Sequence, residues 1–65
     1  MVGKSIKVRE TTGTYYVDVF EVNDDCFRGY MGYDKSDKRT IIGLFPWSAC
    51  LKIKFIGTHN RNEKE

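Results

Sequence analysis

Short runs of residues that alternate between apolar and polar side chains constrain this sequence most. In residues 4–10, KSIKVRE, the apolar residues Ile6 and Val8 alternate with polar ones, and residues 51–56, LKIKFI, repeat the pattern. A period of two is typical of a β-strand with one face on a core, whereas no segment has the spacing of an amphipathic helix. We therefore expect an all-β protein.

Three further segments are predicted to be strands because they are rich in β-branched and aromatic residues and lie between turn residues. They cover residues 14–22, 26–33 and 39–45. Segment 14–22 carries apolar residues on both faces, which predicts a long, bent strand that contributes to both halves of a small barrel. Pro46 has no amide donor and ends the segment before it, which leaves room for one short helical turn.

These elements predict a small five-stranded antiparallel β-barrel with one short helical turn before the last strand. We place a single domain at residues 1–57 of the 65-residue chain and expect residues 58–65 to be a flexible polar tail. Closure of the sheet on itself is expected to remove exposed strand edges. Alternation directs three side chains of the last strand into the core, those of Leu51, Ile53 and Phe55.

Two segments resemble the Src-homology-three family. NDDCFRG at residues 23–29 is similar to the family's acidic turn followed by two tryptophans, a basic residue and a glycine. GLFPWSAC at residues 43–50 is similar to its Gly-x-Phe-Pro-x-Asn-Tyr-Val stretch. The resemblance implies that Phe45 and Cys50 are core residues and that Gly43 lies where a side chain does not fit.

The positions that would line the family's peptide groove differ in this chain. Pro46 is present, but Cys26 stands where the ligand-stacking tryptophan belongs, and Ser48 and Ala49 replace the asparagine and the tyrosine. Polyproline ligands dock on aromatic ridges. The resemblance therefore predicts the fold more than it predicts a polyproline ligand.

The first half of the chain resembles the Sm-like barrels, a family that includes a bacterial RNA chaperone. SIKV at residues 5–8, a turn at Gly13, a long bent strand and Asp24 at the following turn fall in a similar order and spacing. This resemblance also implies five bent strands, with RNA as the ligand. One fold can host unrelated functions, so the ligand has to be inferred from the residues that point outward.

Outward-facing basic residues form the first candidate site. The first and last strands of such barrels commonly pair, which predicts a basic patch of Lys4, Lys7, Arg9, Lys52 and Lys54. The patch could neutralise phosphates or meet an acidic protein surface. Equally, alternating lysines keep edge strands soluble, and Glu10 and Asp18 could dilute the positive field.

Aromatic residues form the second candidate site. We expect a partner-binding surface made of Trp47, Pro46, Tyr15, Tyr30 and Tyr33. Trp47 is the leading contact because it follows Pro46 on a short turn, where a large ring can project. The alternative is that a barrel this small uses these rings to cover its core.

Nothing in the sequence is arranged for catalysis. His59, the only histidine, lies beyond the last predicted strand, so no base is positioned to activate a serine or cysteine nucleophile. No phosphate-cradling glycine loop or set of metal ligands occurs, and we expect no enzyme activity, no cofactor and no metal. Cys26 and Cys50 are expected to be reduced, small apolar residues rather than a disulfide.

A net charge of +2, from 11 basic and 9 acidic residues, is too small for a protein whose whole surface coats nucleic acid. The sequence predicts a non-enzymatic binding or adaptor module that contacts a protein partner. An RNA-binding or single-stranded nucleic-acid-binding barrel is the alternative, and a small regulatory or inhibitory protein of viral or mobile-element origin is the third. No signal peptide or membrane span is recognisable, so we expect a cytoplasmic protein, and its oligomeric state stays open.

Overall fold

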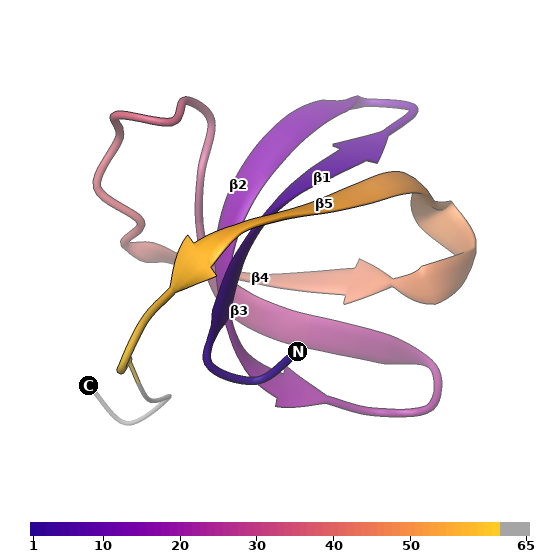
Figure 1. The fold of residues 1–65 in the computed structure, drawn as a ribbon. Coiled ribbons are helices and arrows are strands. Elements are labelled where there is room, and N and C mark those ends of the chain that lie inside the picture. The colour runs from indigo at the N-terminus through magenta and orange to yellow at the C-terminus, as the bar shows by residue number, and fades with distance from the viewer. Residues whose placement is uncertain (62–65) are drawn as a thin grey trace.

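Five antiparallel strands and one turn of 3-10 helix make up the fold, which the computed structural model describes for residues 1–61 (Figure 1). The all-β class, the five strands and the helical turn before the last strand are confirmed. In chain order the elements are β1 (Lys4–Glu10), β2 (Gly13–Val22), β3 (Cys26–Gly32), β4 (Ile41–Pro46), the 3-10 turn η1 (Trp47–Ala49) and β5 (Cys50–Thr58). The described residues contain no helix that is long and apolar enough to cross a membrane.

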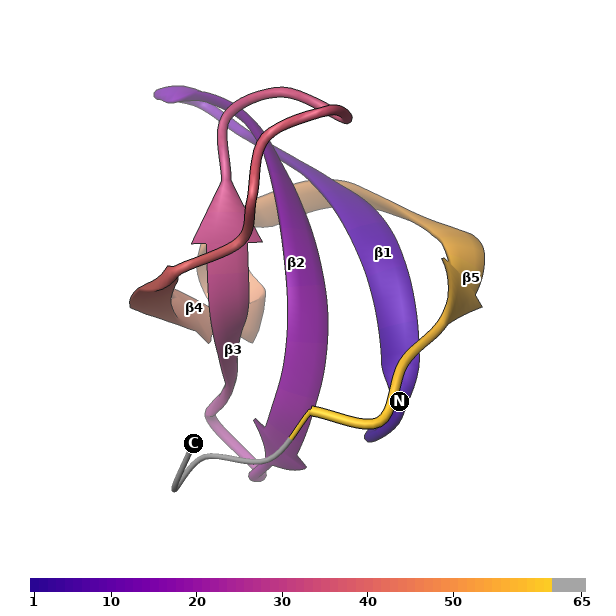
Figure 2. The same cartoon turned by 90° about the vertical axis from the view of Figure 1, so that its left-hand side faces the viewer.

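The strands form one bent sheet in the order β4-β3-β2-β1-β5, with β4 and β5 at its two sides (Figure 2). β1 pairs with both β2 and β5, so the predicted pairing of the first and last strands is confirmed. Over residues 1–61 no ladder joins β4 to β5. The sheet is barrel-like but open, and the expectation that closure removes its edges is wrong. The reason is that η1 carries the chain away from β4 to β1, the strand that pairs with β5 within residues 1–61.

A core of alternating side chains fills the inner face of the bent sheet. It consists of Ile6, Val8, Val17, Val19, Phe27, Met31 and Phe45. Ile53 packs against it from β5, as predicted, but Leu51 and Phe55 are 62% and 60% exposed and do not belong to it. β5 is an edge strand, so no neighbouring strand covers these two side chains.

The long strand β2 is buried on both faces where it bends. Val17 and Val19 face the core, and Asp18 between them is also buried. A register shift after Val19 in the β2–β3 ladder marks the bend. Gly29 of β3 permits the two strands to approach closely here, because a Cβ atom at this position would overlap the carbonyl oxygen of Asp18.

Residues 58–61, the described part of the predicted tail, lie against the first two strands. The backbone N–H of His59 donates a hydrogen bond of 2.9 Å to the carbonyl oxygen of Gly3. The Nε2 atom of His59 lies 2.7 Å from a backbone carbonyl oxygen of β2. The rest of the predicted tail, residues 62–65, lies outside the described residues.

Candidate functional site

Four basic side chains of β1 and β5 lie next to one another on the outer face of the sheet. In the antiparallel ladder Lys7 is directly opposite Lys54, and Arg9 is directly opposite Lys52. All four are exposed and alternate with inward-facing residues of their strands, so they point away from the core. We call these four residues the basic grid.

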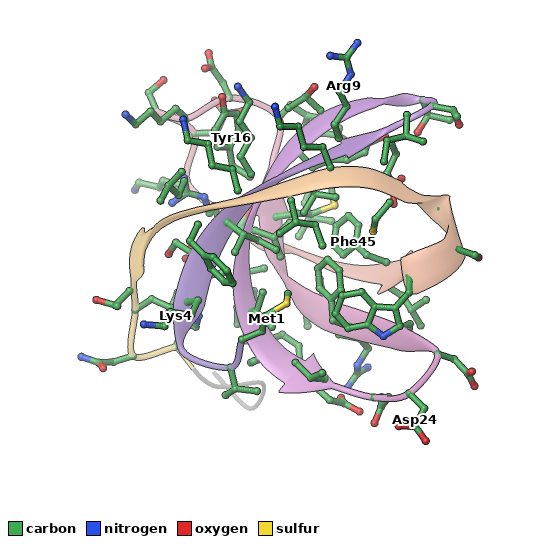
Figure 3. All side chains as sticks on the ribbon, turned by 45° about the vertical axis from the view of Figure 1, so that its right-hand side comes forward. Met1, Lys4, Arg9, Tyr16, Asp24 and Phe45 are labelled. Carbon is green, nitrogen blue, oxygen red and sulfur yellow. The ribbon has the colours of Figure 1, made fainter. Side chains whose placement is uncertain are left out.

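A hollow of about 210 Å³ lies over the basic grid. All four members line it, and Thr14 of β2 adds a hydroxyl group. Tyr16 of β2 is opposite Lys7 in the ladder, and the Nζ atom of Lys7 is 5.9 Å from the centre of the Tyr16 ring. Figure 3 shows Tyr16 and Arg9 along the same upper side of the molecule. The hollow therefore combines positive charge with a hydroxyl group, and an aromatic ring lies beside it.

No member of the basic grid forms an ion pair within residues 1–61. By contrast, Arg28 is 2.6 Å from the carboxylate of Glu21. Like charges directly opposite each other in a ladder destabilise the pair, by roughly 0.2–1 kcal/mol. We therefore expect the basic grid to lower the stability of the free protein, and no described carboxylate pairs with it.

Protection of an exposed edge accounts for only half of the basic grid. Lysines commonly keep an edge strand from pairing with other chains, and Lys52 and Lys54 lie on the edge strand β5. Lys7 and Arg9 lie on β1, which is paired on both sides. Polar residues are typical of the solvent-facing side of an antiparallel strand, and the same exposure makes Lys7 and Arg9 available to an anionic ligand.

The two acidic residues that could dilute this positive field are engaged elsewhere. Asp18 accepts a hydrogen bond of 3.0 Å from Nη1 of Arg61, and Arg39 lies 3.6 Å from its carboxylate. Glu10 is opposite Cys50 in the ladder. Burial and, to a smaller extent, the charge of Glu10 raise the pKa of the Cys50 thiol. Neither carboxylate pairs with the basic grid.

Lys4, the fifth residue of the predicted basic patch, lies outside the basic grid. It is opposite Thr58, at the other end of β1, and it does not line the hollow. Figure 3 shows Lys4 well away from Arg9. The structure thus brings together four of the five predicted basic residues.

Trp47, the leading predicted contact, is held within the fold. Its ring packs against the core, with its centre 4.9 Å from that of Phe27. Its Nε1–H donates a hydrogen bond of 2.9 Å to the carbonyl oxygen of Asn23, and its backbone N–H donates one to that of Asp25. Pro46 beside it is exposed. The indole therefore links η1 to the turn between β2 and β3.

The three predicted tyrosines lie in different environments. Tyr15 is half-buried on the inner face, with its ring 5.7 Å from that of Tyr33 and 5.9 Å from that of Phe45. Tyr33 is 64% exposed. Tyr30 is buried on the outer face, where it is opposite Asp18 in the ladder. The five predicted partner-binding residues therefore do not share one surface.

Sequence reasoning missed Thr14 and Tyr16 as neighbours of the basic residues. A signal was present, because residues 11–12 form a two-residue loop that sets the register between β1 and β2. That register places Thr14 opposite Arg9 and Tyr16 opposite Lys7. No comparable signal identifies Arg39, which lies between strands, as a neighbour of a buried carboxylate.

The described residues offer no group of three or more side chains that could hold a metal ion. Both cysteines are free. His59 directs one ring nitrogen at a backbone carbonyl oxygen and receives the backbone N–H of Arg61 at the other. The four exposed cations of the basic grid are groups suited to hydrogen bonding with an anion.

Comparison of the chain with protein-family models, with curated proteins and with solved structures finds no match. The five antiparallel strands are compatible with the small barrel that both resemblances imply. Phe45 is buried, and a Cβ atom at Gly43 would lie 2.8 Å from Sδ of Met31, as the Src-homology-three-like segment implies for these two positions. A function has to be argued from the site.

Proposed function

We propose that this protein is a non-enzymatic binding module whose basic grid holds the phosphate backbone of a single-stranded nucleic acid. The observation that supports the proposal is that four cations stand side by side and no described carboxylate neutralises them. An anionic ligand relieves the repulsion among them, so ligand binding should stabilise the fold. A cytoplasmic location, where RNA is available, belongs to the same proposal.

Phosphate oxygens suit the side chains around the hollow. Lysine and arginine donate several hydrogen bonds to a phosphate while neutralising its charge, and Thr14 adds a hydroxyl donor. Two residues along a strand span about 6.6 Å, so the two rows of the basic grid can contact successive phosphates of an extended backbone. Contacts of this kind do not depend on base sequence.

The ring of Tyr16 favours a single strand over a duplex. Tyr16 is half-buried beside Lys7, next to the cations that would hold the backbone. Bases of a single strand are free to contact such a ring, whereas the bases of a duplex are stacked on one another. The Sm-like pattern in the first half of the chain points to the same class of ligand.

A protein partner, our first expectation from the sequence, has less support. Pro46 is opposite Cys26 at the start of β3, whereas Tyr33 follows the end of that strand. The seven residues of β3 separate the two by about 20 Å. Tyr30 is buried on the outer face, and the ring and nitrogen of Trp47 are engaged within the fold. The third expectation, an inhibitory protein of viral or mobile-element origin, has no described feature behind it.

Fluorescence anisotropy with a labelled oligouridylate tests the proposal. We expect a slope of about −2 to −3 in log affinity against log salt, the value for a single strand when about three or four phosphates are neutralised. Lys52→Glu and Lys54→Glu should each weaken binding at least about tenfold at low salt. Lys4→Glu, which makes the same change of charge outside the basic grid, should weaken it far less.

An affinity that does not change with salt concentration would contradict the proposed phosphate contact. Equal losses of affinity in Lys4→Glu and Lys54→Glu would contradict it as well. Duplex RNA and polyglutamate serve as comparison ligands. Equal affinity for duplex RNA and for oligouridylate would contradict the proposed contact between the Tyr16 ring and the bases of a single strand. Tighter binding of polyglutamate than of oligouridylate would indicate that the basic grid binds an acidic protein surface rather than a nucleic acid.

A further inference from the structure

Arg39 extends the positive charge of the basic grid across the outer face of the sheet. Lys7 of the basic grid is opposite Tyr16 of β2, and Tyr16 is in turn opposite Gly32 of β3. Gly32 has no side chain, and that of Arg39 lies over it, since a Cβ atom at Gly32 would be 3.6 Å from Cγ of Arg39. The segment between β3 and β4 passes over the end of β3 here (Figure 2). Tyr16 therefore has a cation on each side, one from β1 and one from this segment.

The guanidinium group of Arg39 has few hydrogen-bond acceptors around it. Its Nε atom is buried and has no hydrogen-bond partner among the described residues. Its Nη2 atom donates a long hydrogen bond of 3.4 Å to the carbonyl oxygen of Lys35, and Nη1 is 3.6 Å from Oδ1 of Asp18. An arginine has five N–H donors, and a buried donor without an acceptor costs free energy. The free protein therefore leaves Arg39 with donors to spare.

The charge of Arg39 is not needed to neutralise Asp18. Nη1 of Arg61 donates a hydrogen bond of 3.0 Å to Asp18, so one arginine already balances its single negative charge. The nearby carboxylate of Asp37 accepts a hydrogen bond from the backbone N–H of Tyr33, and within residues 1–61 it forms no ion pair with Arg39. Arg39 is therefore a cation in excess, and an oxyanion is the partner that its planar set of donors fits.

We propose that Arg39 is a fifth ligand-binding cation, which holds a phosphate on the far side of Tyr16 from the basic grid. The inference rests on the proposed function and deepens it. Nζ of Lys7 and Cζ of Arg39 are each 5.9 Å from the centre of the Tyr16 ring. A base on this ring would have one neighbouring phosphate at Lys7 and the other at Arg39. The ligand is then a single strand whose backbone follows β1 along the basic grid and crosses β2 at Tyr16.

Arg39→Gln tests the contact by fluorescence anisotropy with labelled oligouridylate. It should weaken binding at least about fivefold at low salt. It should also reduce the slope of log affinity against log salt by about 0.7, the value for one phosphate of a single strand. Arg39→Lys keeps the charge, so it should keep the wild-type slope and recover part of the affinity. Lys38→Gln makes the same change of charge at an exposed neighbour and should weaken binding less than about twofold.

The salt slope separates ligand binding from a purely structural role beside Asp18. Circular dichroism checks that each variant folds. A folded Arg39→Gln that is less stable but keeps the wild-type affinity and slope would overturn the inference. If Lys54→Glu lost affinity and Arg39→Gln did not, the proposed function would stand without this contact. A wild type that does not bind oligouridylate would overturn both.

Nuclear magnetic resonance tests the contact in the wild type, whether or not Arg39→Gln folds. The Nε–H signal of Arg39, identified by its absence in Arg39→Lys, should shift as oligouridylate is added. The Nε–H signal of Arg28 is the control, because this side chain is paired with Glu21, and it should shift far less. Binding of oligouridylate that leaves the Arg39 signal unchanged would overturn the inference.

Discussion

Ser5 of β1 donates a hydrogen bond of 2.7 Å from its Oγ atom to Oδ1 of Asp18 on β2, and both side chains are buried. Asp18 also accepts a hydrogen bond of 3.0 Å from Nη1 of Arg61, and Arg39 lies 3.6 Å from its carboxylate. A buried charge needs such partners, because removing it from water without them is costly. Asp18 therefore joins β2 to β1, to the segment before β4 and to the residues after β5.

Asp18→Ala should destabilise the fold by about 2–4 kcal/mol, because it leaves the buried Ser5 hydroxyl without its acceptor and removes the carboxylate beside Arg39 and Arg61. The free energy of unfolding, measured in urea, reports the effect. Asp24→Ala is the matched control, because Asp24 is an exposed carboxylate in the turn between β2 and β3. It should change the free energy by less than about 0.5 kcal/mol. Equal decreases in the free energy of unfolding of the two variants would contradict a structural role for Asp18.

Gly29→Ala should destabilise the fold much more than Gly57→Ala, although both glycines lie within strands. An added Cβ atom at Gly29 would overlap the Asp18 carbonyl oxygen and lie 2.6 Å from Cγ1 of Val17, whereas nothing lies within 4 Å of one at Gly57. Overpacking typically costs about 1–3 kcal/mol. Thermal unfolding should give a lower midpoint for Gly29→Ala and an unchanged or raised midpoint for Gly57→Ala. Similar midpoints would show that β2 and β3 have room for a side chain here.

Removing one charge from the basic grid should stabilise the free protein. Lys54→Thr relieves repulsion with Lys7 across the ladder, worth about 0.2–1 kcal/mol at low salt. Salt screens this repulsion, so the gain in the free energy of unfolding should shrink in concentrated sodium chloride. Lys4→Thr is the control, since Lys4 is opposite the uncharged Thr58. If the free energy of unfolding rose equally in both variants at low and at high salt, the strand propensity of threonine rather than relieved repulsion would explain the gain in stability.

Acid should weaken the fold partly through Glu21. The side-chain hydrogen bond from Asn23, and next that from Arg28, lower the pKa of Glu21 below its ordinary value. A carboxyl group with a lowered pKa stabilises the folded state above its ordinary pKa, and this contribution is lost as the pH falls through the lowered value. Glu21→Gln should therefore reduce the difference in the free energy of unfolding between neutral and acidic pH. Asn23→Ala should reduce it in part, and no change in either variant would refute the role of these hydrogen bonds.

Alternation in the sequence is sufficient to predict which side chains of β1 face the core. Ile6 and Val8 are fully buried, and Lys7 and Arg9 lie on the other face. Together with the expected pairing of the first and last strands, this pattern also predicts that the four residues of the basic grid are neighbours. Alternation is informative because successive side chains of a strand point to opposite faces of the sheet, whatever surrounds the strand.

The surroundings of the aromatic residues could not be predicted in the same way. Trp47 follows a proline on a short turn, which indicates a projecting ring, but its N–H reaches Asn23, 24 residues earlier in the chain. Tyr30 lies in a stretch of sequence that contains glycines on both sides of it, and it is expected at the surface. Its side chain is nevertheless buried. Both outcomes depend on segments that are distant in sequence, and residue type alone does not indicate which segments meet.

The strands, the turns between them and the face on which most side chains lie can be predicted from the sequence, because they depend on local periodicity and turn chemistry. Closure of the sheet depends instead on how segments that are distant in the sequence pack together. Leu51 and Phe55 occupy inward positions of an alternating strand and remain exposed, because none of the described strands pairs with the outer side of β5. Asp18 is buried with its charge only because Arg39 and Arg61 reach it from outside the strands. Periodicity sets the direction of a side chain, and the packing of distant segments decides what it meets.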